Sequence, residues 1–334
     1  MQPILQTMRL GTQWPTIDPF LFCAHHRDAY PAANGKLAPQ ASRAGRQLGQ
    51  DFAGLDGWNM YHGQVVPGFP QHPHRGFETI SYMREGYMDH SDSLGAAARF
   101  GEGDVQWMTA GAGIVHAEMF PLFNTDRPNP LEMFQIWLNL PARNKMVPPH
   151  FSMLWSDTIP RVQADGVEVT AIAGDIGDAA APAPPPDSWA GQADSDVAVW
   201  HIRLDADGSW ELPPARFADT NRTVYLYAGG PISVGDEDLQ PSTGAVVRCD
   251  QPVQISDYGD GAELVVLQGR PIGEPVAQYG PFVLNDEAGI RQAFADYQAT
   301  RFGGWPWPDD DPVHGHEIRR FARHADGRVE ERSA

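Results

Sequence analysis

The chain has 334 residues, of which 42% are hydrophobic and 20% are charged, and its formal net charge is −19. This length exceeds what one typical hydrophobic core needs and favours a globular protein of two domains. The acidity disfavours direct binding to nucleic acids or anionic membranes, because their phosphates would be repelled. A protein partner remains compatible with this charge.

Cysteine usage and the start of the chain restrict the class of protein further. Cys23 and Cys249 are far apart, and neither has a partner at metal-ligand spacing, so we expect neither a disulfide framework nor a Cys-based zinc site. Residues 1–15 lack a basic segment followed by an apolar one, and no apolar run approaches the ~20 residues of a membrane helix. We therefore expect a soluble, cytoplasmic protein.

In chain order, short apolar runs alternate with Gly and Pro turn signals, which is typical of β-rich proteins. Each run is about as long as an average strand. The sequence therefore predicts strands in both halves of the chain. The clearest are 77–83, 104–110, 134–140, 167–174, 197–204, 222–229 and 262–269.

Residues 285–302 carry a helical pattern instead. Ile290, Phe294 and Tyr297 recur at helical spacing, and Asn285 or Asp286 can cap the N-terminus. Two glycines at 303–304 then end the helix. The sequence thus predicts an all-β protein with one C-terminal helix.

Composition also suggests where the domains begin and end. Residues 141–151 indicate a connector, and the proline-rich segment 178–187 indicates an exposed loop. From Asp309 onward the chain is charged without apolar periodicity, so we expect a loosely ordered tail. The predicted parts are an N-terminal metal-binding domain at 1–145, a C-terminal domain without metal at 152–308 and a polar tail at 309–334.

Two pairs of polar residues in the first half point to a metal site. His72 and His74 are two residues apart, and the later pair of His116 and Glu118 repeats that spacing. Residues two apart in a strand point to the same face, so two neighbouring strands would aim four ligands at one point. Imidazole nitrogen and carboxylate oxygen suit iron, manganese, nickel, copper or zinc. The sequence therefore predicts a mononuclear site formed by these four residues.

Glu78 is the competing carboxylate, because it follows His74 by four residues and has the same strand parity. We favour Glu118 as the ligand and Glu78 as a group that supports the ligands by hydrogen bonding. A single His-x-His is commonly a surface or core feature. A second pair, also in a β context, is much harder to obtain by chance.

Other residues of this half receive weaker predictions. His62 and His90 are expected to be exposed or hydrogen-bonded, with His90 in a polar loop, and His25 and His26 are assigned no role. Several apolar residues are expected either to line a pocket for an aromatic ligand or to pack as core. They are Phe77, Ile80, Trp107, Met108, Phe134 and Trp137.

At HPHRGFET, GDVQWMTAGAGIVHAEM, FQIWLNLP and GPFVLN…IRQAFADYQATRFG, the sequence resembles the pirin family of the cupin superfamily. The resemblance covers about residues 63–141 and 262–304. It implies a bicupin, two stacked antiparallel β-barrels of jelly-roll type, with a metal only in the N-terminal barrel. It also implies Fe(II) as the metal and His72, His74, His116 and Glu118 as the ligands. The general cupin pattern instead places the ligand glutamate at Glu78, and an asparagine where Phe120 stands.

The resemblance also implies an activity. Several pirins resemble quercetin 2,3-dioxygenases, which open a flavonol ring with O₂. A flavonol hydroxyl would then bind the metal while Glu118 takes its proton as general base. Other pirins resemble non-enzymatic regulators that sense metal or redox state and bind a protein partner, and this is the alternative function. The sequence departs from the family pattern in the segment 20–62, the loop at 178–187 and the tail beyond Trp307. The resemblance therefore does not determine the substrate.

Overall fold

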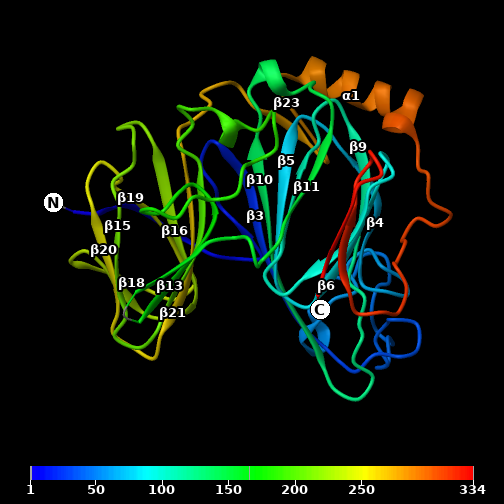
Figure 1. Cartoon of the computed structure of the whole chain (residues 1–334), viewed down its shortest axis with the longest axis horizontal. Coiled ribbons are helices and arrows are strands. Elements are labelled where there is room, and N and C mark those ends of the chain that lie inside the picture. Colours follow the sequence, from blue (N-terminus) through cyan, green and yellow to red (C-terminus); the bar gives the residue numbers. More distant parts are fainter. Residues whose placement is uncertain (1, 165, 334) are drawn as a thin grey trace. The chain divides into compact units, whose positions relative to one another are not determined.

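The computed structural model describes residues 2–164 and 166–333 and divides the chain into two units, each made of three segments. Unit 1 comprises Met1–Ala24, Ile136–Pro141 and Asp157–Gly273. Unit 2 comprises His25–Gln135, Ala142–Ser156 and Glu274–Ala334. Figure 1 shows the elements along the chain. The predicted domain limits at residues 145, 152 and 308 stay predictions.

Unit 1 contains two antiparallel sheets that pack face to face. Its strands are β1 (Ile4–Arg9), β2 (Gln13–Trp14), β12 (Arg161–Ala164), β13 (Val167–Ala173), β14 (Ala198–Leu204), β15 (Ser209–Leu212), β16 (Asn221–Gly229), β17 (Ile232–Val234), β18 (Glu237–Leu239), β19 (Thr243–Val247), β20 (Val253–Asp257) and β21 (Ala262–Gly269), with the 3₁₀ turn η3 (Trp189–Gly191). The sheet orders are β1-β19-β16-β21-β14-β13-β12 and β15-β20-β17-β18. Alternate residues of both sheets, such as Trp200, Val224 and Ile255, form one buried core.

Unit 2 is built in the same way. Its strands are β4 (Gly68–His74), β5 (Phe77–Glu85), β6 (Tyr87–Asp92), β7 (Ala97–Gly101), β8 (Val105–Thr109), β9 (Ile114–Met119), β11 (His150–Leu154), β22 (Ala277–Tyr279), β23 (Phe282–Leu284), β24 (Arg320–Arg323) and β25 (Val329–Arg332), with η1 (Leu55–Gly57), η2 (Ala142–Asn144) and η4 (Arg301–Gly303). Strands β3 (Phe20–Tyr30) and β10 (Asn129–Asn139) contain residues of both units. The sheet orders are β11-β8-β5-β10-β3-β2, β25-β24-β7-β6-β9-β4 and the pair β22-β23. Met83, Phe100 and Phe151 lie in the core between the two larger sheets.

The predicted fold class is confirmed: the chain is mostly β, and each of the seven predicted strand segments overlaps a strand. The sheets keep free edges in the described part of the chain, so the units are open jelly-roll sandwiches and not fully closed barrels. No helix in residues 2–164 and 166–333 is long and apolar enough to cross a membrane.

The predicted helix is also confirmed, as α1 (Glu287–Thr300). The Asp286 side chain caps it by accepting a 2.7 Å hydrogen bond from the Gly289 amide. Arg301 ends it in the left-handed conformation, two residues before the glycines that we expected to do so. Ile290 and Phe294 pack against Phe282 of β23.

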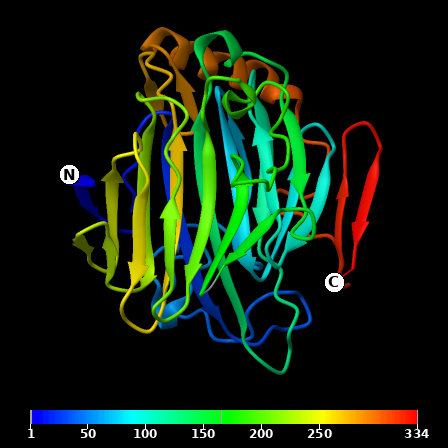
Figure 2. The same cartoon turned by 60° about the vertical axis from the view of Figure 1, so that its left-hand side comes forward.

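The expectation of a loosely ordered tail is wrong. Strands β24 and β25 form a hairpin that pairs with β7, at the edge of the sheet that contains β4 and β9 (Figure 2). The buried Arg99 of β7 donates to the carbonyls of Gly315 and Glu317, and its charge is paired with Asp89 at 2.6 Å. The sequence hides this arrangement because backbone pairing, hydrogen bonds from Arg99 and the ion pair of Arg320 with Asp104 hold the tail, rather than an apolar stripe.

The turn between β4 and β5 provides a test of how the fold positions these strands. Gly76 has φ +88°, and a Cβ at this residue would lie 2.0 Å from the Val283 carbonyl oxygen. We expect Gly76→Ala to lower the free energy of unfolding by about 2–4 kcal/mol, because left-handed strain and a backbone clash add together.

Gly95→Ala is the matched control, since Gly95 has φ +84° and no described residue other than its chain neighbours has an atom within 4 Å of the place that a Cβ would occupy. It should lose only about 1–2 kcal/mol, the cost of strain alone. Urea denaturation of both variants measures the difference. Equal losses would show that the close approach of Val283 does not constrain this turn.

Candidate metal centre

Two neighbouring strands carry the four predicted ligands. His72 and His74 lie on β4, and His116 and Glu118 lie on β9, which pairs with β4 antiparallel. His72 is directly opposite His116, and the register shifts between Phe69 and His72. Opposed residues of an antiparallel pair have neighbouring side chains, so the pairing brings the two sequence motifs together.

The three histidines form one compact cluster. The ring centroids are 4.4 Å apart for His72 and His116, 4.8 Å for His72 and His74, and 4.9 Å for His74 and His116. One nitrogen from each ring lies within 4.8 Å of the others. Two nitrogens bound at about 2.1 Å in tetrahedral geometry lie about 3.4 Å apart, so the rings would have to approach one another by up to about 1.4 Å to share one ion.

The hydrogen bonding of the rings supports this fit. Both ring nitrogens of His116 are buried and have no hydrogen-bond partner among residues 2–164 and 166–333, although leaving such groups unpaired costs free energy. By contrast, His72 Nδ1 donates to the Pro70 carbonyl at 2.9 Å, and His74 Nδ1 to the Pro281 carbonyl at 3.4 Å. A carbonyl on Nδ1 makes Nε2 the nitrogen that carries the lone pair, which is the usual arrangement in a metal-binding histidine.

The electrostatics keep these imidazoles neutral. Burial lowers the pKa of His72 and lowers the pKa values of His74 and His116 well below the ordinary value. Repulsion between the neighbouring rings lowers the pKa values of His74 and His116 further. Since neutral imidazole is the form that binds a metal, the cluster is prepared to accept a cation.

Glu118 lies at the edge of this cluster. Its Oε2 is 4.0 Å from Nε2 of His116. The same carboxylate accepts hydrogen bonds from Gln135 Nε2 at 3.1 and 3.2 Å, and Ser81 Oγ lies 3.0 Å from Oε1. Glu118 is thus close enough to turn toward an ion, while residues of the opposite sheet hold its position.

The competing carboxylate has a different environment. Glu78 lies on β5, is fully buried and accepts a 2.6 Å hydrogen bond from Thr109 Oγ1. This bond ties it to the neighbouring strand β8 of its own sheet. The choice of Glu118 over Glu78 as ligand stays a prediction.

The structure corrects the position of His90. It lies on β6 rather than in a polar loop, is fully buried and bonds Asp92 at 3.1 Å. Its ring centroid is 5.6 Å from that of His116. His62 agrees with the prediction, since it is exposed and hydrogen-bonded to the Gly49 carbonyl.

Sequence reasoning misses a hydrogen-bonded chain on β3. His26 Nδ1 lies 2.9 Å from the Tyr61 hydroxyl, which donates to Asp28 at 2.6 Å. Burial lowers the pKa of His26 to about 4 and raises the pKa of Asp28 to about 6. The available signal is the two-residue spacing of His26 and Asp28 within one long strand, which places both on one face.

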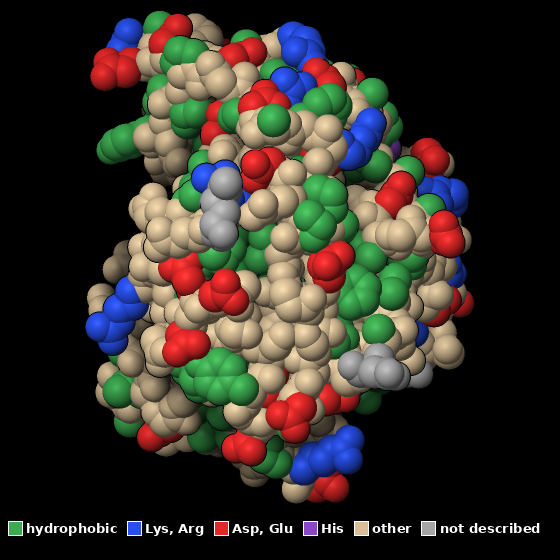
Figure 3. Space-filling view, turned by 90° about the vertical axis from the view of Figure 1, so that its left-hand side faces the viewer, with side chains coloured by type: hydrophobic (Ala, Val, Ile, Leu, Met, Phe, Trp, Pro, Cys, Tyr) green, Lys and Arg blue, Asp and Glu red, His purple; other side chains and the backbone are tan. Residues whose placement is uncertain are grey.

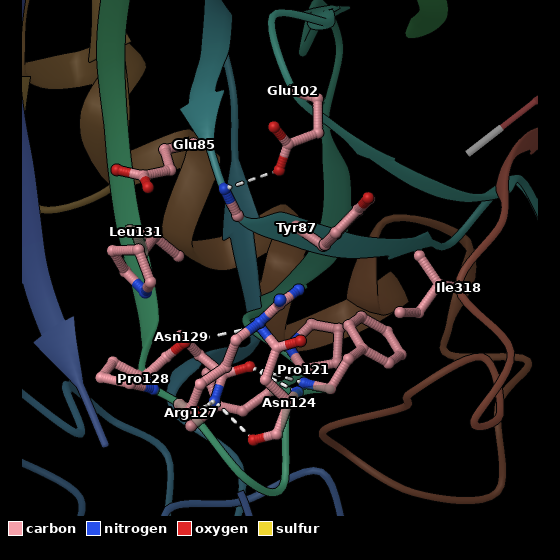
Figure 4. A pocket seen from close by; sticks show the side chains of 14 residues that line it. Glu85, Tyr87, Glu102, Pro121, Asn124, Arg127, Pro128, Asn129, Leu131 and Ile318 are labelled. Carbon is pink, nitrogen blue, oxygen red and sulfur yellow. Dashed lines mark hydrogen bonds between the residues drawn. The ribbon is translucent and has the colours of Figure 1, made fainter. Parts of the chain in front are cut away.

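The predicted pocket residues are mostly core. Ile80, Trp107, Met108 and Phe134 are fully buried, whereas Trp137 is half-buried. Phe77 is buried and packs edge-on against the His74 ring, with centroids 5.1 Å apart. A separate cavity of about 420 Å³ in unit 2 is lined by none of the predicted ligands (Figure 4). Its lining includes Glu85, Tyr87, Glu102, Arg127, Asn129 and Ile318.

Comparison with known proteins agrees with this fold. Residues 5–138 match the Pirin family, and residues 199–303 match the Pirin C-terminal cupin domain. The chain is 34% identical to pirin of Homo sapiens over 273 residues, which covers 78% of this chain and 88% of human pirin. The chain belongs to the pirin family.

Two further relatives concern activity. A protein of Pseudomonas aeruginosa named "Putative quercetin 2,3-dioxygenase PA3240" is 38% identical over 245 residues, covering 70% of this chain and 79% of its own length. A crystal structure of quercetin 2,3-dioxygenase from Acinetobacter baumannii superposes with a TM-score of 0.71 and 26% identity, covering 91% of this chain and 99% of the other. Both are similar to this chain over most of their length.

Proposed function

We propose that this protein is a metal-dependent dioxygenase whose ion is held by His72, His74, His116 and Glu118. The observation that carries the proposal is the pair of buried, unpartnered nitrogens of His116, in a ring whose centroid lies within 4.9 Å of those of the other two histidines. Iron(II) is the proposed metal, and the donor set also suits manganese, nickel, copper or zinc.

The proposed substrates are a flavonol-like aromatic compound and O₂, in line with the similarity to quercetin 2,3-dioxygenases. The ion would supply an acidic binding point for a substrate hydroxyl and mediate electron transfer to O₂. Glu118 would take the hydroxyl proton on a carboxylate oxygen. The amide of Gln135 would hold that carboxylate in place during the transfer.

The first test concerns the metal. We expect His74→Ala to weaken metal retention by more than about tenfold, because the ion loses one of its ligands. Loss of a residue that only hydrogen-bonds a ligand already costs about tenfold or more in metal affinity. His62→Ala is the matched control, since His62 is an exposed histidine of the same unit that bonds a backbone carbonyl. Dialysis against a competing chelator, followed by elemental analysis, measures the bound metal.

Equal metal content in the wild type and His74→Ala would contradict the ligand set. Loss of metal in His62→Ala to the same extent would mean that the assay reports general damage to the protein rather than ligation.

The second test concerns turnover. Protein loaded with Fe(II) under anaerobic conditions should consume O₂ and open the ring when quercetin and air are added. Glu118→Gln should retain metal through the three histidines but lose about 10²–10⁴-fold in rate, which is the usual contribution of a general base. Glu78→Gln makes the same substitution in the opposite sheet and should keep more activity.

Failure of ring opening with iron, manganese, nickel and copper would exclude the quercetinase function and favour the metal-sensing regulator. Loss of metal in Glu78→Gln, but not in Glu118→Gln, would instead reverse the roles of the two carboxylates.

A further inference from the structure

Unit 1 contains a cavity of about 380 Å³ that no part of the proposed dioxygenase uses. Residues on β14, β16 and β21 line one side of it, namely Trp200, Arg222 and Gln268. The remaining walls include residues of the proline-rich loop predicted at 178–187 and of the segment after β15. They are Pro182, Pro184, Pro213 and Pro214.

Arg222 is the unusual member of this lining. The residue is 1% exposed, although arginine is almost never fully buried without a charged partner. Nε donates to the Gln268 side-chain oxygen at 2.7 Å, and Nη2 donates to the same oxygen. The third nitrogen, Nη1, is buried and has no hydrogen-bond partner in the part of the chain that the structure describes.

The geometry of guanidinium defines what remains available. Nε and Nη2 form one edge of the planar group, and Gln268 occupies it. The other edge, which combines an N–H of Nη1 with the second N–H of Nη2, has the spacing of a carboxylate. Arg222 therefore offers a pair of parallel donors, and its Nη1 has no acceptor among the described residues.

No carboxylate of the described residues neutralises Arg222 by contact. Asp196 also lines the cavity, but its Oδ2 accepts from the Arg216 amide at 2.9 Å and from Thr220 Oγ1 at 2.8 Å. The thiol of Cys249 donates to the Thr220 carbonyl rather than contacting Arg222. Asp196 attracts the Arg222 charge without contacting it, so an anion at hydrogen-bond distance from Nη1 would stabilise this buried charge further.

The remaining walls restrict the shape and charge of that anion. The Arg222 guanidinium carbon lies 5.8 Å from the Trp200 ring centroid, and Trp200 Nε1 is fixed by the Gly174 carbonyl at 2.9 Å. The indole and prolines suit a flat apolar body. Asp175 and Asp196 in the lining disfavour a polyanion. The net charge of −19 does so too, and Figure 3 shows acidic side chains scattered over one face of the molecule.

We propose that this cavity binds a small organic acid. Its single carboxylate lies on the free edge of Arg222, and its apolar body lies between Trp200 and the prolines. The site is separate from the histidine cluster and does not depend on the proposed function, because all of its residues belong to unit 1.

Benzoate is the probe, and benzyl alcohol is its neutral control. Titration calorimetry of the full chain should show one saturable benzoate site and no saturable binding of benzyl alcohol. Arg222→Gln should weaken benzoate binding by about tenfold or more, which corresponds to about 1.4 kcal/mol. Arg222→Lys keeps the charge but loses the paired donors, so its affinity for benzoate should lie between those of the wild type and Arg222→Gln.

Two control variants separate this site from other effects. Arg203→Gln removes an exposed positive charge from the same strand as Trp200 and should bind benzoate like the wild type. His74→Ala should also bind benzoate like the wild type. Loss of benzoate binding in this variant would instead place the ligand on the histidine cluster.

Equal binding by the wild type and Arg222→Gln would overturn the proposal, as would the absence of saturable binding by the wild type. If the Arg222 variants do not fold, anomalous diffraction from a wild-type crystal soaked with 4-bromobenzoate tests the same site. An anomalous bromine peak beside Trp200 supports the proposal, and a peak elsewhere, or none, overturns it.

Discussion

The antiparallel pairing of β4 with β9 is the constraint on which the candidate metal centre depends. It sets His72 opposite His116, so two motifs about forty residues apart in the chain become one cluster. The turn at Gly76 and the bonds from His72 and His74 to carbonyls then fix the ring directions. A shift of this register by one residue would turn β9 over and point His116 away from its partners.

Much of the site can be predicted because strand parity is a local property. His72 with His74, and His116 with Glu118, share faces wherever their strands lie, and glycine turns mark where those strands begin and end. Strand parity cannot decide whether Glu118 or Glu78 is the ligand. Both have suitable parity, and only contacts across the sheets, such as that of Gln135 with Glu118, distinguish their surroundings.

Other features escape prediction because long-range contacts determine them. The tail carries few apolar residues. Its strand β24 pairs with the edge of β7, and Arg99 donates to the carbonyls of Gly315 and Glu317, which precede that strand. The polar neighbours of His90 are typical of a loop, yet Asp92 hydrogen-bonds Nε2 of this histidine inside the sheet. The composition of the Pro-rich segment 178–187 correctly predicts a loop with exposed residues, but not that part of this loop lines the Arg222 cavity.

The two units thus put different chemistry on their strands. Unit 2 gathers neutral imidazoles and a carboxylate, which suit a cation. Unit 1 has Arg222 and Gln268 on paired strands, which suit an anion. The most direct test of the proposed metal centre is anomalous diffraction at the iron edge from crystals prepared anaerobically with Fe(II). We expect one peak about 2.0–2.2 Å from Nε2 of His72, His74 and His116 and from a Glu118 oxygen. A peak bound by Glu78 instead, or none at this cluster, would contradict the proposed ligand set.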